Sequence, residues 1–273
     1  MSEISKYGVV GNPIKHSKSP EIHSTFAEQT NQQMQYLPIL IALDGFQSGI
    51  QQFVAKGGRG LNVTVPFKQQ AWDIADELSE RAQLAGAVNT LSFVDGVIKG
   101  DNTDGTGLVR DLTANQCFDL KGKSILILGA GGAVRGVLGP IIDEMPSSIT
   151  IANRTLSKAE VLKGVFSDVF DIQVMSFESL NKSYDLIING TSASLQQELP
   201  PLPDCIVDAD TILYDMMYSK EPTVFNRWGN KLGADKTIDG LGMLVEQAAE
   251  AFSLWRGVSP DSRLIIDKIR KSF

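Results

Sequence analysis

Residues 124–133 carry the sequence SILILGAGGA, an apolar run that ends in a glycine-rich turn. The run 124–128 has the length of a buried strand, and the residues that follow, up to Glu144, favour a helix. A strand, a turn of the form Gly129-x-Gly131 and a helix together begin a dinucleotide-binding βαβ unit. There the glycines let backbone N–H groups approach a pyrophosphate, and the helix N-terminus supplies partial positive charge. This stretch therefore predicts a nucleotide-binding fold of the α/β class.

Further strand-like runs lie on both sides of this stretch, and amphipathic segments separate most of them. Strands that alternate with helices indicate parallel sheets with covered faces. One exception is expected before the glycine turn, where Asp95-Gly96 joins two short apolar runs and is typical of a tight antiparallel hairpin. The sequence thus predicts two α/β lobes, the first with a mixed sheet and the second with a parallel sheet. The other strand-like runs are residues 7–10, 36–41, 61–65, 149–151, 172–175, 186–188 and 211–214.

The sequence also indicates where the first lobe ends and where the C-terminal helices lie. The first lobe should end near Asp104, on the helix that follows residues 100–103. Residues 240–273 should form two helices, the first stopped by Gly257 and the second begun by Ser259-Pro260. From the residues alone, these helices could pack on either lobe.

The composition favours a small-molecule ligand. The 273 residues suffice for two domains, with 42% hydrophobic and 21% charged residues. A net charge of −7 disfavours binding to nucleic acid or to an anionic membrane, and the longest apolar runs are strand-sized. Cys117 and Cys205 are far apart and the N-terminus lacks a secretion signal, so we expect a reduced, cytoplasmic protein. With His16 and His23 as the two histidines, no metal site is predicted.

The residues after the second strand of the βαβ unit indicate the cofactor. An NAD-binding unit carries Asp or Glu there to hold the ribose 2′-hydroxyl, whereas this chain has Asn153-Arg154-Thr155, with Lys158 one turn later. Arg154 and Lys158 can pair with a 2′-phosphate, which predicts NADP (NADPH) rather than NAD. The simpler alternative is that both are solvated charges, although two cations at a helix start are unfavourable without an anion.

Three polar clusters in the first lobe predict a second site. They are residues 16–20, residues 62–68, and Asn89 together with residues 100–105. If the strands are parallel, all three clusters lie near carboxyl ends, where open α/β sheets bind ligands. Each also has a simple structural explanation, such as Ser19 acting as a helix cap.

Together these segments resemble the shikimate dehydrogenase family. The resemblance extends from about residue 8 to about residue 260, and the segments at 62–68 and 101–105 are its most specific parts. The matching segments are SKSP (17–20), NVTVPFK (62–68), AGAVNT (85–90), GDNTDG (100–105), GAGGA (129–133), NRT (153–155), YDM (214–216) and DGLGMLVEQA (239–248).

The resemblance implies an NADP-linked reversible reduction of 3-dehydroshikimate to shikimate, a step towards the aromatic amino acids. It implies that residues 1–104 form a substrate-binding domain completed by the helices of 240–273, and that residues 105–239 form a Rossmann-type NADP domain. Lys68 and Asp104 would be the catalytic pair. The substrate would be held by Ser17, Ser19, Thr64, Lys68, Asn89, Asp104, Tyr218 and Gln247. The cofactor would be held by Gly129, Ala130, Gly131, Gly132, Ala133, Asn153, Arg154, Thr155, Lys158, Met216, Gly240 and Glu80.

The chain departs from the family pattern at two positions. Val134 stands where the phosphate turn usually has a small residue, and Ser194 stands where a glycine is expected. Neither change removes a group that does chemistry.

The chemistry of ketone reduction agrees with the proposed pair. Hydride transfer places negative charge on the carbonyl oxygen, so a proton donor or cation must lie beside it. Lys68 suits this role with Asp104 orienting it, and which of the two transfers the proton stays open. One alternative is a paralogue that also uses quinate or NAD; another is a non-catalytic sensor of shikimate or nucleotide, although a sensor does not need the pair. The assembly is expected to be a monomer or a homodimer.

Overall fold

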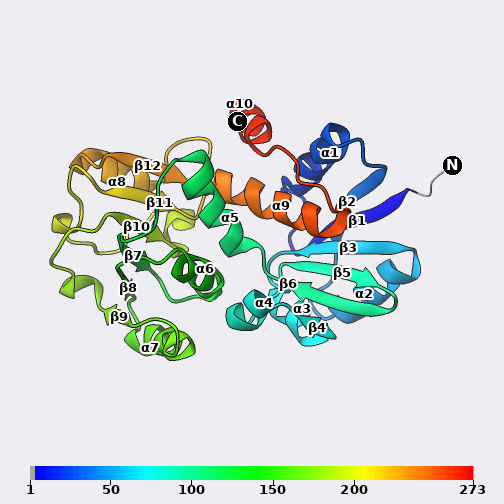
Figure 1. Cartoon of the computed structure of the whole chain (residues 1–273), viewed down its shortest axis with the longest axis horizontal. Coiled ribbons are helices and arrows are strands. Elements are labelled where there is room, and N and C mark those ends of the chain that lie inside the picture. Colours follow the sequence, from blue (N-terminus) through cyan, green and yellow to red (C-terminus); the bar gives the residue numbers. More distant parts are fainter. Residues whose placement is uncertain (1–3, 273) are drawn as a thin grey trace. The chain divides into compact units, whose positions relative to one another are not determined.

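The computed structural model describes residues 4–272 of the chain. The chain forms two compact units: unit 1 comprises residues 4–107 and 245–272, and unit 2 comprises residues 108–244. Each unit contains a six-stranded sheet with helices around it, which confirms the predicted α/β class (Figure 1). The division into functional domains at 104/105 and 239/240 stays a prediction, and its residues 1–3 and 273 lie outside the described residues.

The sheet of unit 1 is mixed, as predicted. Its order is β2-β1-β3-β5-β6-β4, with β1 parallel to β2 and β3, and β5 antiparallel to β3 and β6. Asp95 and Gly96 join β5 to β6 with φ angles of 51° and 83°, the left-handed geometry of a tight hairpin turn. The strands are β1 (Ser5–Gly11), β2 (Met34–Leu40), β3 (Gly58–Val63), β4 (Glu77–Leu78), β5 (Thr90–Val94) and β6 (Val97–Asp101).

Helices cover both faces of this sheet. On one face Leu61 of β3 packs with Phe46 and Phe67, which belong to α2 and to the turn before α3. On the other face Trp255 of α9 stacks on Tyr7 of β1. The helices are α1 (Ser19–Gln29), α2 (Phe46–Ala55), α3 (Lys68–Ile74), α4 (Glu80–Ala85) and α10 (Arg263–Ser272), while α5 (Asp104–Arg110) and α9 (Leu241–Arg256) each continue from one unit into the other.

One predicted helix cap and one predicted helix start are wrong. Helix α1 begins at Ser19, but its N-cap residue is Lys18 and no side chain caps it, while the Ser17 hydroxyl accepts a hydrogen bond from the Ser19 N–H at 3.3 Å. Helix α9 ends before Gly257, whose φ is +67°, as expected, but α10 begins at Arg263 and not at Ser259-Pro260. Local capping preferences identify the turn and miss the exact start by a few residues.

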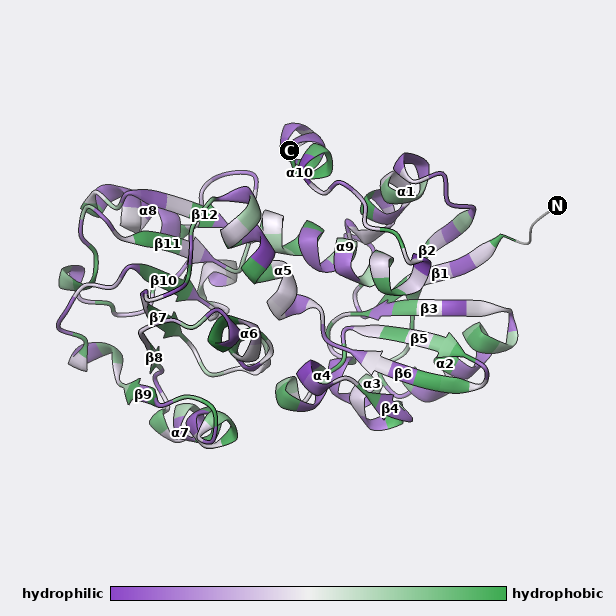
Figure 2. Ribbon diagram, in the orientation of Figure 1, coloured by the Kyte–Doolittle hydropathy of each residue, from purple (hydrophilic) through white to green (hydrophobic). Residues whose placement is uncertain are grey.

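The sheet of unit 2 is fully parallel, which confirms the predicted Rossmann-type lobe. Its order is β12-β11-β10-β7-β8-β9, so the chain winds outward from β7 to β9, then crosses to β10 and winds the other way. The side chains of residues 125–128 are fully buried, and Figure 2 shows the apolar character of the central strands. The strands are β7 (Ser124–Leu128), β8 (Ser148–Ala152), β9 (Ile172–Met175), β10 (Leu186–Asn189), β11 (Ile212–Asp215) and β12 (Lys236–Asp239).

The helical segments of unit 2 connect these parallel strands. Val137 and Ile141 of α6 and Phe225 of α8 are fully buried, as the crossover helices of a covered sheet should be. Within residues 4–272, no helix is both long enough and apolar enough to cross a membrane. The segments are η1 (Asp111–Asn115), α6 (Gly132–Asp143), α7 (Leu156–Phe166), η2 (Phe177–Ser179), η3 (Ala193–Gln196), η4 (Asp204–Ile206) and α8 (Val224–Leu232).

Candidate functional site

Unit 2 has a cavity of about 620 Å³ at the end of the sheet where the strand order reverses. Open α/β sheets bind nucleotides at this switch point, here between β7 and β10. The residues that line the cavity include the predicted cofactor residues Gly129–Ala133, Asn153–Thr155 and Lys158. The structure therefore brings together three predicted segments that follow β7 and β8.

The glycine turn has the geometry that a pyrophosphate requires. Gly129 has φ +104°, and a Cβ there would lie 3.3 Å from the carbonyl oxygen of Gly190. No side chain caps the start of α6, and added Cβ atoms on Gly131 and Gly132 would meet open space. The first-turn N–H groups of α6 can therefore bind an anion that approaches the backbone closely.

Arg154 and Lys158 are exposed and line the same cavity as the glycine turn. Arg154 follows β8 directly, and Lys158 lies in the first turn of α7, which has no side-chain cap. Two cations at a helix N-terminus are unfavourable by themselves, because the helix dipole repels them. A bound 2′-phosphate removes this penalty, so the arrangement fits NADP.

Val134 lies next to Gly190, the residue that follows β10. Its side chain is fully buried, and its Cγ2 lies 2.4 Å from the position that a Cβ on Gly190 would take. The absent side chain at Gly190 thus leaves the space that Val134 fills. The sequence shows Val134 as a departure but not its contact with Gly190, because 56 positions separate the two residues.

None of the predicted cofactor residues lies on the far wall of the cavity, although the resemblance noted Ser194, in the loop on the nicotinamide side, as a departure. This wall is formed largely by the loop after β10, by η3 and by the proline-rich segment that follows. A signal was present, because Gly190 follows β10 as Gly129 follows β7, but the pairing of these two strands is not visible from the sequence. The missed residues are Phe177, Gly190, Thr191, Ser192, Ala193, Gln196, Glu198, Leu199, Pro200 and Pro201.

In unit 1, Lys68 and Asp104 form an ion pair. The first residue of α3 is Lys68 and the first residue of α5 is Asp104, and the Nζ to Oδ2 distance is 2.5 Å. The side chains are 32% and 15% exposed, so both stay accessible to a ligand while they orient each other. An oriented ammonium group of this kind can donate to a developing oxyanion.

Asn89 connects this pair to the C-terminal part of the chain. Its Nδ2 donates to Asp104 Oδ1 at 2.8 Å and to Gln247 Oε1 at 3.3 Å, and Asn89 is 2% exposed. The expectation that Asn89 ends a parallel strand is wrong, because it precedes β5. Since β5 runs antiparallel to β3, its amino end still lies at the edge where β3 ends.

Arg81, which sequence reasoning did not single out, fixes the segment leading to Asp104. Its guanidinium donates to both carboxylate oxygens of Asp101, at 2.6 and 2.9 Å, and to Glu250 Oε1 at 2.9 Å. Burial opposes the charge of Asp101, but hydrogen bonds from Arg81 and Ser79 hold its pKa below its ordinary value. Asp101 thus stays ionised and anchors the end of β6.

The two predicted serines, Ser17 and Ser19, lie at the start of α1, and Ser19 is hydrogen-bonded to Tyr36. Ser19 is buried and Ser17 is half-buried. Burial raises the pKa of Tyr36, which a hydrogen bond with the Ser19 side chain opposes, and the Tyr36 hydroxyl donates to Asn62 Oδ1 at 2.7 Å. Thr64 follows β3 and is half-buried.

The remaining predicted residues are distributed over both units. Met216 follows β11, and Gly240 precedes α9, where an added Cβ would lie 2.3 Å from the Met216 carbonyl oxygen. Tyr218 is half-buried in unit 2, and burial, followed by the Asp239 charge, raises its pKa. Glu80 is exposed at the start of α4 in unit 1. The roles given to these four residues stay predictions.

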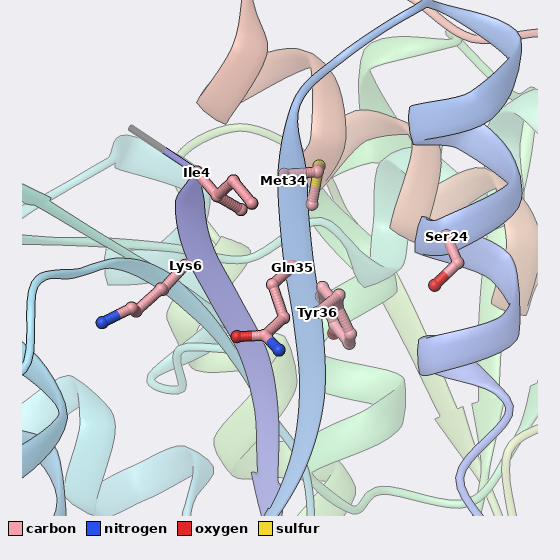
Figure 3. Close-up of a pocket in the computed structure, with 6 residues that line it drawn as sticks. All are labelled: Ile4, Lys6, Ser24, Met34, Gln35 and Tyr36. Atoms are coloured by element: carbon pink, nitrogen blue, oxygen red, sulfur yellow. The ribbon is translucent and has the colours of Figure 1, made fainter. Parts of the chain in front are cut away.

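Another cavity, of about 530 Å³, lies in unit 1 over β1, β2 and α1 (Figure 3). Ile4, Lys6, Ser24, Met34, Gln35 and Tyr36 line it, and none is a predicted site residue. The Lys6 ammonium donates to the Lys56 carbonyl oxygen at 2.8 Å, so this cation is already engaged.

Models of shikimate dehydrogenase domains match most of the chain. The Shikimate dehydrogenase substrate binding domain matches residues 9–91, the Shikimate / quinate 5-dehydrogenase model matches residues 111–198, and the Shikimate 5′-dehydrogenase C-terminal domain matches residues 240–270.

Individual relatives agree with these matches. The shikimate dehydrogenase (NADP(+)) of Hahella chejuensis is 55% identical over 97% of this chain and 98% of its own length. A crystal structure of an Ael1 enzyme from Pseudomonas putida has a TM-score of 0.93 at 45% identity and covers 97% of both chains. Shikimate 5-dehydrogenase from Thermus thermophilus, solved with NADP(H) and shikimate, has a TM-score of 0.89 at 30% identity and covers 99% of this chain and 100% of its own.

Proposed function

The chain belongs to the shikimate dehydrogenase family, and on this premise we propose how its residues carry out the reversible, NADP-linked reduction of 3-dehydroshikimate to shikimate. It is an NADP-dependent oxidoreductase of the shikimate pathway. The observation that carries the proposal is the accessible ion pair of Lys68 and Asp104, held by Asn89 beside Gln247.

The nicotinamide supplies the hydride when NADPH is bound, and the protein must supply the proton. The substrate's carbonyl carbon accepts the hydride and its oxygen accepts a proton, which yields the secondary alcohol. Lys68 stabilises the negative charge that grows on this oxygen, and Asp104 orients the ammonium group through the 2.5 Å contact. In the reverse direction the pair accepts the proton of the alcohol.

Neutral side chains bind the rest of the substrate. Shikimate carries a carboxylate and hydroxyl groups, which hydroxyl and amide side chains can bind by hydrogen bonds. The amide groups of Asn89 and Gln247 lie within 3.3 Å of each other, and the Asn89 amide reaches Asp104 as well. With the ion pair of Lys68 and Asp104 included, the proposed substrate residues are Ser17, Ser19, Thr64, Lys68, Asn89, Asp104, Tyr218 and Gln247.

The cofactor residues have two tasks. The backbone of Gly129–Ala133 and the N-terminus of α6 bind the pyrophosphate, while Arg154 and Lys158 bind the 2′-phosphate. Asn153, Thr155, Met216 and Gly240 complete the proposed set, and Glu80 is retained as a proposed contact from unit 1.

Steady-state kinetics test this proposal. The purified protein should reduce 3-dehydroshikimate with NADPH far more efficiently than with NADH, and should oxidise shikimate more efficiently than quinate. Equal efficiency with quinate would favour a relaxed paralogue. Absence of any nicotinamide oxidation would contradict the proposal and favour a ligand sensor.

We also propose that the enzyme works in the cytoplasm as a monomer or a homodimer. Cys117 and Cys205 are exposed and unpaired with each other, which suits a reducing compartment. Sedimentation equilibrium of the purified protein tests the assembly.

A further inference from the structure

A buried polar cluster joins the ends of β10 and β11, and the mechanism above does not use it. Its members are Asn189, Ser194, Asp215 and Thr223, which are exposed by 0%, 5%, 0% and 4%. Asn189 ends β10 and Asp215 ends β11, and the two residues are partners in the parallel register. A carboxyl group buried this completely is costly unless hydrogen-bond donors satisfy it.

The donors around Asp215 are uncharged. Ser194 Oγ donates to Oδ2 at 2.6 Å, while Asn189 Nδ2 and the Met217 N–H donate to Oδ1 at 3.2 and 3.1 Å. Burial raises the pKa of Asp215 from its ordinary value, although hydrogen bonds with Ser194 and Thr223 oppose this. Among these donors Ser194 makes the shortest bond, and it is the one that comes from a cavity-lining segment.

Ser194 belongs to η3, which forms part of the cavity wall in unit 2. Residues 191–193 line the cavity directly before Ser194, and Gln196 lines it two positions after. Asp215 is followed by Met216, whose Sδ lies 3.2 Å from the position that a Cβ on Gly190 would take. The bond from Ser194 to Asp215 therefore fixes the cavity wall to the central sheet.

The place of this wall in the sheet identifies the part of the cofactor it contacts. Each half of a doubly wound sheet binds one mononucleotide. Arg154 and Lys158 follow β8 and mark the half for the adenosine with its 2′-phosphate. The loop 190–193 follows β10, so it belongs to the half that binds the nicotinamide mononucleotide.

We infer that Ser194 is a positioning residue for the cofactor: its hydroxyl fixes η3 to Asp215 and holds the loop 190–193 in the shape that binds the nicotinamide half of NADP(H). This inference deepens the proposed function and rests on it. A purely structural serine would stabilise unit 2 and leave cofactor affinity unchanged.

The test measures cofactor binding without turnover. Ser194→Ala removes the hydroxyl, and Asp215→Asn replaces one acceptor oxygen by an NH2 group of similar size. Ser167→Ala is the matched control, because Ser167 is an exposed residue whose hydroxyl donates to the Gly164 carbonyl oxygen outside the cavity lining. The Kd values of NADPH and NADH come from fluorescence titration of each folded variant, and kcat from steady-state kinetics.

Loss of one hydrogen bond predicts a Kd increase of about three- to tenfold for Ser194→Ala, and an increase in the same direction for Asp215→Asn. The Kd increase should be the same for NADPH and NADH, because the 2′-phosphate belongs to the adenosine half of the cofactor and the loop 190–193 contacts the nicotinamide half. With saturating cofactor, kcat and the KM for shikimate should stay close to the wild-type values, and Ser167→Ala should change nothing.

Unchanged Kd values in Ser194→Ala would overturn the inference, as would an increase confined to NADPH. If Ser194→Ala does not fold, Asp215→Asn is judged by the same criterion, and failure of both to fold would assign the cluster a structural role and overturn the inference. A wild-type protein that binds NADPH without reducing 3-dehydroshikimate would contradict the proposed function alone.

Discussion

Arg154 is the residue on which the cofactor preference depends most directly. A guanidinium group forms bidentate, charge-assisted bonds with a phosphate, each worth about 1.5–3 kcal/mol. We therefore expect Arg154→Ala to raise the KM for NADPH by about tenfold or more while the KM for NADH changes little. Lys163→Ala, which removes a cation from α7, the helix that follows Arg154, but outside the cavity lining, serves as the control. Equal responses of both cofactors would contradict the phosphate assignment.

His23 gives the stability of unit 1 a dependence on pH. Burial among aromatic rings, with Tyr36 stacked 4.1 Å away, lowers the pKa of His23 from 6.5 to about 3. The unfolded chain then binds the proton more tightly than the folded chain. The contribution of neutral His23 to the free energy of unfolding is therefore fully present above pH 6.5 and is lost as the pH falls towards 3.

Between pH 6.5 and pH 5, this difference predicts a loss of about 2 kcal/mol from the free energy of unfolding. Urea denaturation at several pH values should show a smaller loss in His23→Phe than in the wild type. His16→Gln, which changes the exposed histidine, should keep the wild-type dependence. The same dependence in His23→Phe would show that other groups cause it.

The role of a single residue could be predicted where its position in a local sequence motif determines which ligand group it faces. Arg154 and Lys158 could be assigned because the position after the second strand of a βαβ unit faces the ribose. Arg81 could not, because its partners Asp101 and Glu250 lie 20 and 169 positions away along the chain. No local pattern distinguishes this arginine from a solvated one.

The contact between α6 and the end of β10 depends on a large residue facing a small one. Val134 occupies the space that a side chain at Gly190 would need. Gly190→Ala alone should destabilise the protein by about 1–3 kcal/mol, because the added methyl group overpacks this contact. The double variant with Val134→Ala should be less destabilised than the sum of the single variants, by about 1 kcal/mol. Thermal unfolding of the four proteins measures this coupling, and strict additivity would contradict the proposed packing.

At the level of elements, the hydrophobic pattern identified most strands and the hairpin, but it missed β4 and β12 and did not give the pairing of the strands. The expectation that every polar cluster follows the carboxyl end of a strand was wrong for Asn89, because β5 is reversed by its position in a hairpin. Asn89 nevertheless reaches Asp104, since the start of an antiparallel strand lies at the end of its neighbour. Asp95-Gly96 predicted that β5 and β6 are antiparallel to each other, but the direction of β5 relative to β3 follows from the packing of the complete sheet.

For the whole molecule, the sequence predicted two α/β lobes and the type of each sheet. It did not predict the far wall of the cofactor cavity, which depends on β10 lying next to β7 although 57 residues separate the end of β7 from the start of β10. The resemblance named the residues of unit 1, and the structure joins Lys68, Asn89, Asp104 and Gln247 by hydrogen bonds. Which strands become neighbours is decided by the packing of the complete sheet.

The most direct test of the central claim is the turnover of Lys68→Ala with 3-dehydroshikimate and saturating NADPH. If the ammonium group acts on the carbonyl oxygen in the transition state, kcat should fall about a hundredfold or more while the KM for 3-dehydroshikimate changes little. Lys99→Ala, which breaks the exposed ion pair with Glu77 in the same unit, should keep wild-type turnover. A kcat for Lys68→Ala close to that of the wild type would contradict the account.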